Sequence, residues 1–355
     1  MNYLIYCGPG IGDFILILPM AKCIRANDPN CNIKVITTSS KDRMVISKKL
    51  FELQDAIDEI DYYSGGEKFH SLQFLLKNGY KKYDYGFVLQ YTDNENTSEF
   101  PNKLVSIASK ITCGIRMKSK PHVKYDYYIE PEDGKRIADK PLLMLKAIGF
   151  PTLKYLGTLL NLSKIEKHLP PIDIDKNKKI VSLCVGTAPV SIKKNGVFLF
   201  NDSKNWDYHN WIQLSRLLVD DGFCVFLLGG KKEQDDMMPM LTEKIGDCIY
   251  NFLGTCSIIQ SLSLLNISSI VVGADTGLMH CSGALNKPSL TLFGCTDYNE
   301  YLPFGEKSEY ITAGIPCSPC FGTDLSVMCK EKKCMNNISV EKVYRRIKSI
   351  IHKYE

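Results

Sequence analysis

Residues 271–297 read VVGADTGLMHCSGALNKPSLTLFGCTD, and this stretch decides the fold. An apolar run over 269–273 is typical of a buried strand, and it ends at a glycine. A helical segment over 278–285 follows, and a second buried strand is expected over 289–293. Two strands joined by one helix form a βαβ unit with parallel strands. We therefore predict a doubly wound α/β sheet around this segment.

Strands and helices alternate through the rest of the second half. We expect strands at 179–185, 223–228 and 248–251, and helices at 208–220, 234–245 and 258–265. A basic amphipathic helix is predicted over 339–352, with an apolar stripe formed by Val343, Ile347, Ile350 and Ile351. This alternation predicts a Rossmann-like domain over 178–335.

The first half repeats this organisation. We expect strands at 3–7, 32–38, 85–90 and 112–116, and helices at 13–27, 101–109 and 140–148. The segment 163–179 is rich in Pro, Lys and Asp and lacks apolar periodicity, so we interpret it as an interdomain linker. We predict two Rossmann-like domains, 1–168 and 178–335, facing a central cleft, with the helix of 336–355 packing back on the first.

Length and composition agree with this organisation. At roughly 150 residues per domain, the 355 residues correspond to about two domains. With 45% hydrophobic and 23% charged residues, the chain has the composition of a soluble globular protein, which excludes global disorder. We recognise no membrane-spanning run and no secretory signal, so we expect a cytoplasmic protein. The net charge of +5 permits acidic substrates but does not indicate a dedicated nucleic-acid binder.

The first glycine turn resembles a dinucleotide loop but departs from it. Gly8, Gly10 and Gly12 form G-x-G-x-G, yet Asp13 stands where a third glycine would be expected. The strand that ends at 36–38 offers no acidic residue for a ribose, so the sequence argues against NAD or FAD. Either Gly10 and Gly12 bring the Asp13 carboxylate to the cleft at a helix N-terminus, or Asp13 only caps the helix.

The turn after the strand at 269–273 carries several polar groups. Backbone N–H groups near Gly277, where a helix begins, can bind a diphosphate, and the Thr276 hydroxyl can add a donor. Asp275 can accept hydrogen bonds from sugar hydroxyls, and His280 lies on the first helical turn. The alternative is a capping Asp-Thr pair beside a packed histidine.

Three further loops supply complementary chemistry. Glu233, after a strand end, can accept from two ribose hydroxyls, or it is a solvated glutamate at a helix start. Lys204 can neutralise a phosphate, or it points to solvent. Thr187 follows the first strand of the second half and can donate to the same phosphates.

Five segments together resemble glycosyltransferase family 9, the ADP-heptose:lipopolysaccharide heptosyltransferases. They occur in the family's order over nearly the whole chain: GIGDFILILPMAKCIR at 10–25, KNWDYHNWIQLSRLL at 204–218, LLGGKKEQD at 227–235, the stretch at 271–297, and CSPC followed by CM between 317 and 335. The resemblance implies a GT-B fold, with acceptor binding in the first domain and nucleotide-sugar binding in the second. It also implies an inverting reaction that needs no metal.

The resemblance assigns roles to the residues singled out above. Asp13 matches the family's proposed catalytic base, and Gly10 and Gly12 lie with it on the acceptor side. The donor-side matches are Thr187 and Lys204 at the phosphates, Glu233 at the ribose, Asp275 at a sugar hydroxyl, Thr276, Gly277 and His280 around the diphosphate, and Cys256 near the adenine pocket. Residues 189–203 extend the loop before Lys204 beyond the family pattern.

The resulting hypothesis is transfer of a heptose from ADP-heptose to a saccharide acceptor, in lipopolysaccharide or lipooligosaccharide core assembly, with no cofactor needed for catalysis. The alternatives are a related transferase that uses another nucleotide sugar or a protein acceptor, and an inactive nucleotide-binding module. No GxSxG, HExxH or P-loop motif indicates a different enzyme class. The basic terminal helix is either a peripheral contact to the inner membrane or a packed helix with solvated charges.

A cysteine cluster near the C-terminus suggests a structural metal. Of 14 cysteines, four have the spacing Cys317-x₂-Cys320-x₈-Cys329-x₄-Cys334. Four thiolates at short spacings in a cytosolic protein favour a tetrahedral zinc site, or iron in the same ligand set. The spacing is not the usual one between two zinc knuckles, so reduced or disulfide-paired cysteines are the alternative.

Overall fold

The structure is a computed structural model that describes residues 1–38, 48–63, 74, 77, 79–91, 98–133, 136–153, 156–175, 177–194, 197–240 and 248–355. It divides the chain into two compact units, Met1–Asn161 and Leu162–Glu355. The division comes just before the segment 163–179 that we interpret as a linker. That segment begins within a short helix, α6 (Leu162–Glu166), which packs against α9 of the second unit.

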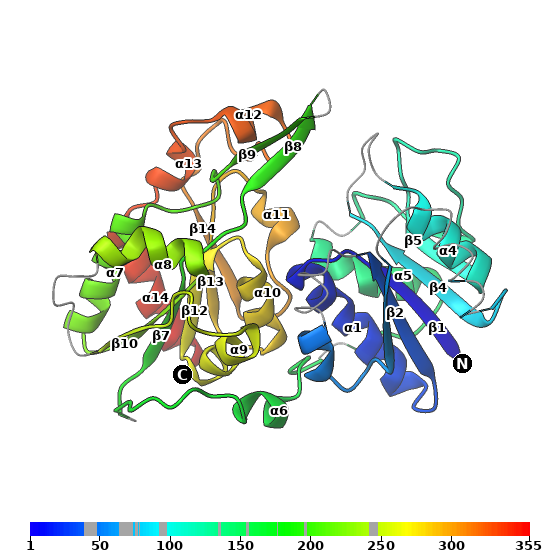
Figure 1. The fold of residues 1–355 in the computed structure, drawn as a ribbon, viewed down its shortest axis with the longest axis horizontal. Helices are drawn as coiled ribbons and strands as arrows, with labels where there is room; N and C mark the ends of the chain where they lie inside the picture. The colour runs from blue at the N-terminus through cyan, green and yellow to red at the C-terminus, as the bar shows by residue number, and fades with distance from the viewer. Residues whose placement is uncertain are drawn as a thin grey trace. The chain divides into compact units, whose positions relative to one another are not determined.

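The first unit contains a six-stranded parallel sheet in the order β3-β2-β1-β4-β5-β6 (Figure 1). Its strands are β1 (Asn2–Cys7), β2 (Asn32–Thr38), β3 (Glu59–Tyr63), β4 (Tyr83–Leu89), β5 (Ser109–Ile115) and β6 (Tyr127–Ile129). Its helices are α1 (Ile11–Asn27), α4 (Phe100–Ala108) and α5 (Lys140–Ala147), with a 3₁₀ turn at Ile137–Asp139. Helix α1 follows β1 directly, and its run from Phe14 to Ala21 is entirely buried.

The second unit contains a parallel sheet in the order β11-β10-β7-β12-β13-β14. Its strands are β7 (Ile180–Cys184), β10 (Cys224–Leu228), β11 (Ile249–Asn251), β12 (Ile270–Ala274), β13 (Ser289–Phe293) and β14 (Ser308–Thr312). Its helices are α7 (Tyr208–Asp220), α8 (Lys231–Met237), α9 (Ile258–Ile267), α10 (Gly277–Ala284), α11 (Tyr298–Tyr301), α12 (Asp324–Met328), α13 (Lys333–Asn336) and α14 (Val340–Tyr354), with a 3₁₀ turn at Met238–Met240.

Both sheets have the strand order of a doubly wound Rossmann fold, with the first strand in the middle and the order reversing beside it. The predicted α/β class is therefore confirmed. All five residues of β7, β10, β12 and β13 are buried, as is typical of parallel strands that are covered on both faces.

The prediction that the last helix packs on the first unit is wrong. The apolar stripe of α14 is buried in the core of the second unit, where α14 packs against α7, β12 and β13. The segment before it is also tied there, since the indole N–H of Trp206 donates to the carbonyl of Ile338 at 3.0 Å. An amphipathic stripe shows that a helix needs a partner surface but does not identify that surface.

The long segment before Lys204 is also more regular than a loop. Strands β8 (Val190–Lys194) and β9 (Val197–Asn201) pair antiparallel as a separate two-stranded sheet. This ribbon is contacted by α12. The extension at 189–203 is thus a hairpin that leads into the turn carrying Lys204.

Candidate functional site

The candidate donor site of the second unit lies where parallel strands end. Strands β7, β10, β12 and β13 are neighbours and run in the same direction, so their carboxyl ends meet at one edge of the sheet. Thr187 follows β7, Glu233 follows β10 and Asp275 follows β12. Ligands of open α/β sheets bind at this edge.

An ion pair lies at the centre of this edge. The ammonium of Lys204 is 2.7 Å from Oδ2 of Asp275. Both side chains are largely enclosed, with exposed fractions of 17% and 7%. Lys204 therefore does not point to solvent, which was one of its two interpretations. Its three N–H donors allow it to bind Asp275 and a phosphate together.

Helix α10 begins beside this pair. Thr276 is its N-cap residue in extended backbone, and its hydroxyl makes no capping hydrogen bond. The Asp-Thr cap offered by the alternative interpretation is therefore not formed by Thr276. The backbone N–H groups of Gly277 and Leu278 precede the helix's own hydrogen bonds. The N–H of Met279 already donates to the carbonyl of Thr276 at 3.1 Å. An eight-residue helix with such an end favours a bound anion.

His280 lies on the first turn of α10. Its Nδ1 is buried and has no hydrogen-bond partner among the residues that the structure describes. Burial lowers the pKa of this imidazole below its ordinary value; the carboxylate of Asp275 acts in the opposite direction, and Lys204 lowers the pKa further. His280 is therefore neutral at neutral pH, and one ring nitrogen needs a partner from water or ligand.

Glu233 is a helix-start residue, but it is buried rather than solvated. Its Oε2 accepts from the backbone N–H of Gly230 at 2.7 Å, so the Glu233 side chain caps the start of α8. The side chain lies so close to Gly186 that a Cβ there would be 2.8 Å from the Glu233 carboxyl carbon. Glycine at 186 thus makes room for this carboxylate. Thr187, the next residue in the chain, is half-buried.

Cys256 lies on another loop of the second unit. It is half-buried in the turn before α9, next to the N-cap residue Ser257. Burial raises the pKa of the Cys256 thiol, and a hydrogen bond with Thr255 opposes this. The thiol is therefore protonated and can serve as a small apolar wall.

Asp13 lies in the third position of α1 in the first unit. Its Oδ2 accepts from the backbone N–H of Gly10 at 2.9 Å, so the capping interpretation of Asp13 describes a real contact. A Cβ on Gly8 would be 2.6 Å from this oxygen, and one on Gly10 would be 2.8 Å from it. The two glycines therefore let the loop close around a carboxylate. Gly12 lies inside the first turn of α1.

Tyr91 is a neighbour of Asp13 that the sequence analysis missed. It follows β4, and its hydroxyl is buried without a hydrogen-bond partner among the described residues. Burial raises the pKa of Tyr91 well above its ordinary value, and the Asp13 charge raises it further. The strand-end rule that selected Asp275 could also have selected Tyr91, because a strand was expected to end at 90.

Phe321 is the second residue that was missed. Its ring centroid lies 5.0 Å from the Lys204 ammonium. Its ring also meets Tyr301 edge to face, with centroids 5.6 Å apart. No spacing in the sequence connects Phe321 with Lys204, since different loops bring them together.

The four C-terminal cysteines differ in exposure: Cys317 is exposed, Cys320 and Cys329 are half-buried, and Cys334 is buried. Burial, and then neighbouring thiols, raises the pKa of Cys320 and Cys334 to about 11. The backbone N–H of Lys332 donates to Sγ of Cys329 at 3.4 Å. In the part of the chain that the structure covers, no three His, Cys, Asp or Glu side chains are placed to hold a metal ion. The metal site stays a prediction.

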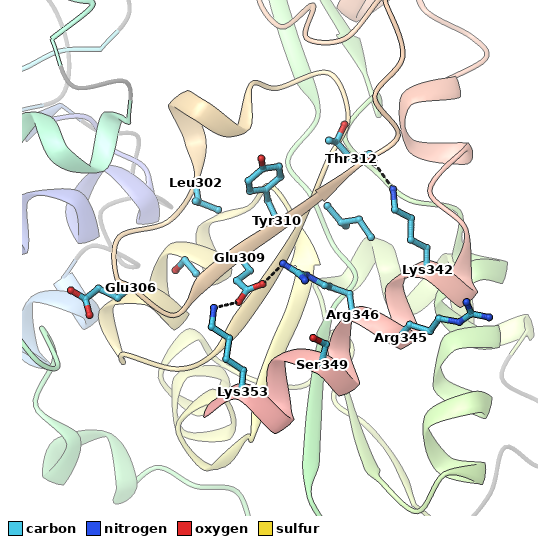
Figure 2. Close-up of a pocket in the computed structure, with 12 residues that line it drawn as sticks. Leu302, Glu306, Glu309, Tyr310, Thr312, Lys342, Arg345, Arg346, Ser349 and Lys353 are labelled. Carbon is cyan, nitrogen blue, oxygen red and sulfur yellow. Dashed lines mark hydrogen bonds and ion pairs between the residues drawn. The ribbon is translucent and has the colours of Figure 1, made fainter. Parts of the chain in front are cut away.

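A groove of about 810 Å³ lies elsewhere, between β14 and α14. Figure 2 shows Arg346 and Lys353 pointing from α14 toward Glu309 on β14. Both cations pair with that carboxylate, at 2.5 and 2.8 Å. Lys342 donates to the carbonyl of Thr312. None of the predicted site residues lines the groove, and its cations are already engaged.

A search for membrane spans among the described residues finds no helix long and apolar enough to cross a bilayer.

Known proteins resemble this chain in sequence and in fold. A family model described as glycosyltransferase family 9 (heptosyltransferase) matches residues 131–331. Lipooligosaccharide heptosyltransferase 2 of Haemophilus influenzae is 23% identical over 322 residues, which cover 88% of each chain.

Two solved structures from Escherichia coli share the fold over almost their whole length. ADP-heptose lipopolysaccharide heptosyltransferase II superposes with a TM-score of 0.69 at 16% identity, covering 100% of this chain and 99% of the other. Heptosyltransferase WaaC, solved with ADP, gives 0.72 at 17% identity, covering 99% and 100%. These likenesses confirm the predicted GT-B fold.

Proposed function

The chain belongs to glycosyltransferase family 9, the heptosyltransferase family, and we propose that it transfers a heptose from ADP-heptose to a saccharide acceptor of a lipopolysaccharide or lipooligosaccharide core. The observation that carries this proposal is the enclosed Lys204–Asp275 pair beside the start of α10. It combines a cation and helix N–H groups for a diphosphate with a carboxylate for sugar hydroxyls.

The reaction that these groups suit is a direct displacement at the anomeric carbon. The acceptor oxygen forms the new bond to that carbon as the bond to the diphosphate oxygen breaks, which inverts the configuration. Asp13 takes the proton of the attacking hydroxyl, and the nucleoside diphosphate leaves with the bonding electron pair. The Gly10 N–H donates to the Asp13 carboxylate and helps to orient it. A carboxylate has several lone pairs, so it can also accept a hydrogen bond from an acceptor hydroxyl.

Fixed positive charge supports departure of the diphosphate. Lys204 and the N-terminus of α10 provide it without any ion, so we propose that turnover is independent of metal. The Glu233 carboxylate is oriented by the Gly230 N–H. Its proposed role is to accept hydrogen bonds from the ribose hydroxyls. Full turnover in excess EDTA is expected, and a requirement for added Mg²⁺ or Mn²⁺ would contradict this part of the proposal.

The identity of the donor's nucleobase is proposed from the comparisons with known proteins. The likeness to a structure solved with ADP and to an ADP-heptose lipopolysaccharide heptosyltransferase favours an ADP-sugar. A UDP- or GDP-sugar transferase, or an inactive binding module, is the competing function. Thermal unfolding with ADP-heptose, UDP-glucose and GDP-mannose tests it. We expect ADP-heptose to raise the Tm most. Stabilisation by a UDP-sugar but not by ADP-heptose would refute the donor assignment.

Contact with a membrane surface is a further part of the proposal, because a lipopolysaccharide acceptor is a glycolipid. Among the basic residues of α14, Arg345 is 77% exposed although it pairs with Glu341. We propose that this contact is made at the cytoplasmic face of the membrane. Anionic vesicles should therefore retain the protein weakly, and added salt should release it. No retention at low salt would leave a water-soluble saccharide or protein as the acceptor.

A further inference from the structure

Phe321 is an exposed aromatic residue in a firmly anchored position. The residue is 40% exposed, although burial of a phenylalanine ring stabilises a folded protein. It lies in the turn after Cys320, and the backbone N–H groups of both residues donate to the carbonyl of Cys295, at 2.8 and 2.9 Å. Cys295 follows β13 in the sequence, so this turn is fixed to the sheet edge that carries the candidate donor site.

The turn is also closed by its own hydrogen bonds. The carbonyl of Cys320 accepts from the hydroxyl of Thr323 at 2.6 Å and from its backbone N–H at 3.1 Å. Gly322 supplies the left-handed backbone that the turn needs, with φ of 80°. The backbone therefore holds the Phe321 ring in one place.

The ring is held against the lysine of the donor site. One neighbour is the ammonium of Lys204, 5.0 Å from the ring centroid, and the other is the Tyr301 ring. A cation within about 6 Å of an aromatic face is attracted to it. An aromatic ring is a much weaker hydrogen-bond acceptor than a carboxylate or phosphate oxygen. The Phe321 ring can therefore restrain the ammonium and leave its N–H donors to Asp275 and a phosphate.

We infer that Phe321 is a positioning residue: it acts through Lys204 and holds that ammonium where the diphosphate of the donor must bind. The inference rests on the proposed function for the identity of the ligand. A lysine side chain with four rotatable bonds loses much freedom when it binds an anion. The contacts with Asp275 and Phe321 remove part of that freedom before the ligand arrives, which raises affinity.

A double-mutant cycle with ADP as the probe tests the inference. Calorimetric Kd values are measured for the wild type, Phe321→Ala, Lys204→Met and the double variant. Phe321→Ala is expected to weaken ADP binding by about 3- to 10-fold in the wild-type background. With Lys204→Met already present, the same substitution should change Kd by less than about 2-fold, because the ring then has no cation to position.

Two controls separate positioning from structure. Phe321→Tyr keeps the ring and should bind ADP within about 2-fold of the wild type. Met328→Ala removes another exposed side chain from the same region, 66% exposed, and should leave Kd unchanged. An equal loss from Phe321→Ala in both backgrounds would overturn the inference, because it would show an effect that does not pass through Lys204.

A second measurement does not depend on any nucleotide. The folded protein is treated with a small acetylating reagent, and the rate at which Lys204 is modified is followed by mass spectrometry. We expect Phe321→Ala to raise that rate at least about 3-fold and Phe321→Tyr to leave it unchanged. If no nucleoside diphosphate binds the wild type, the proposed function fails while this rate still decides the positioning role. An unchanged rate in Phe321→Ala would refute it.

Discussion

The Lys204 ammonium and the Asp275 carboxylate are 2.7 Å apart at the carboxyl end of β12, although 71 positions separate them in the chain. The pair joins the turn that follows the β8–β9 hairpin to the start of α10. It thereby brings together two loops that the donor hypothesis needs at one place.

Breaking this pair should destabilise the protein. Lys204→Met leaves the Asp275 carboxylate enclosed without its cation, which we expect to lower the free energy of unfolding by about 2–4 kcal/mol. Adding Asp275→Asn should restore most of the lost free energy of unfolding, because the enclosed side chain at 275 is then uncharged. Urea denaturation measures both. Lys231→Met, which removes a 72% exposed partner of Asp235, is the control and should change little. Equal stability of Lys204→Met and wild type would contradict the enclosed pair.

Two variants of Glu233 should separate its role in capping α8 from its proposed role in nucleotide binding. Glu233→Gln keeps an oxygen for the Gly230 N–H but loses the charge, so the fold is retained while ADP binding weakens by about 10-fold. Glu233→Ala loses both and should also cost about 1 kcal/mol of stability. Calorimetry and urea unfolding give the two quantities, with Asp235→Ala on the same helix as the control. Unchanged ADP affinity in Glu233→Gln would exclude a charged ribose contact.

The lowered pKa of His280 predicts that the free energy of unfolding depends on pH. Because burial lowers the pKa of His280 in the folded state, the unfolded chain binds more protons just below pH 6.5. Stability should therefore fall as pH drops through 6.5 toward the folded pKa, by at most about 1.4 kcal/mol per pH unit from this group. His280→Gln should flatten the curve between pH 7.5 and 5.5, as measured by urea unfolding. His209→Gln, at a 76% exposed histidine, should not; identical slopes for His280→Gln and wild type would contradict the assignment.

The cysteine loop gives a prediction that is independent of catalysis. If Cys317, Cys320, Cys329 and Cys334 hold a structural ion, protein purified without chelators contains close to one equivalent of zinc or iron. Elemental analysis decides, and Cys317→Ser with Cys320→Ser should remove the metal, while Cys256→Ser, outside the loop, should not. Less than about 0.2 equivalents in the wild type would refute the metal site.

The sequence predicts the strand ends better than it predicts what packs over them. Asp275 could be placed because it directly follows a five-residue buried strand, and Glu233 because it lies in the first turn of the helix after another such strand. Parallel strands end at a common edge. Phe321 could not, because its contact with Lys204 depends on how a long irregular segment folds back. The partner of α14 was also missed, since either unit could have covered its apolar stripe.

Short strands were missed for a related reason. Strand β3 is only partly buried, with Tyr63 as its one buried residue, and β14 likewise buries only Ile311. Strands of this kind at sheet edges carry no continuous apolar run, and five residues are too few for a clear alternation. The capping contact of Asp13, in contrast, was one of the two interpretations that its position allowed.

The most direct test of the account is heptose transfer by Asp13→Asn. Asparagine keeps a side-chain oxygen for the Gly10 N–H, so the start of α1 is preserved while the base is removed. Single-turnover transfer from ADP-heptose to a heptose-free core acceptor is measured together with the ADP-heptose Kd. We expect the wild type to transfer heptose and Asp13→Asn to be slower by about 10²- to 10⁴-fold, with donor affinity within about 2-fold of the wild type. A near-normal rate in Asp13→Asn, or no transfer by the wild type, would contradict this expectation.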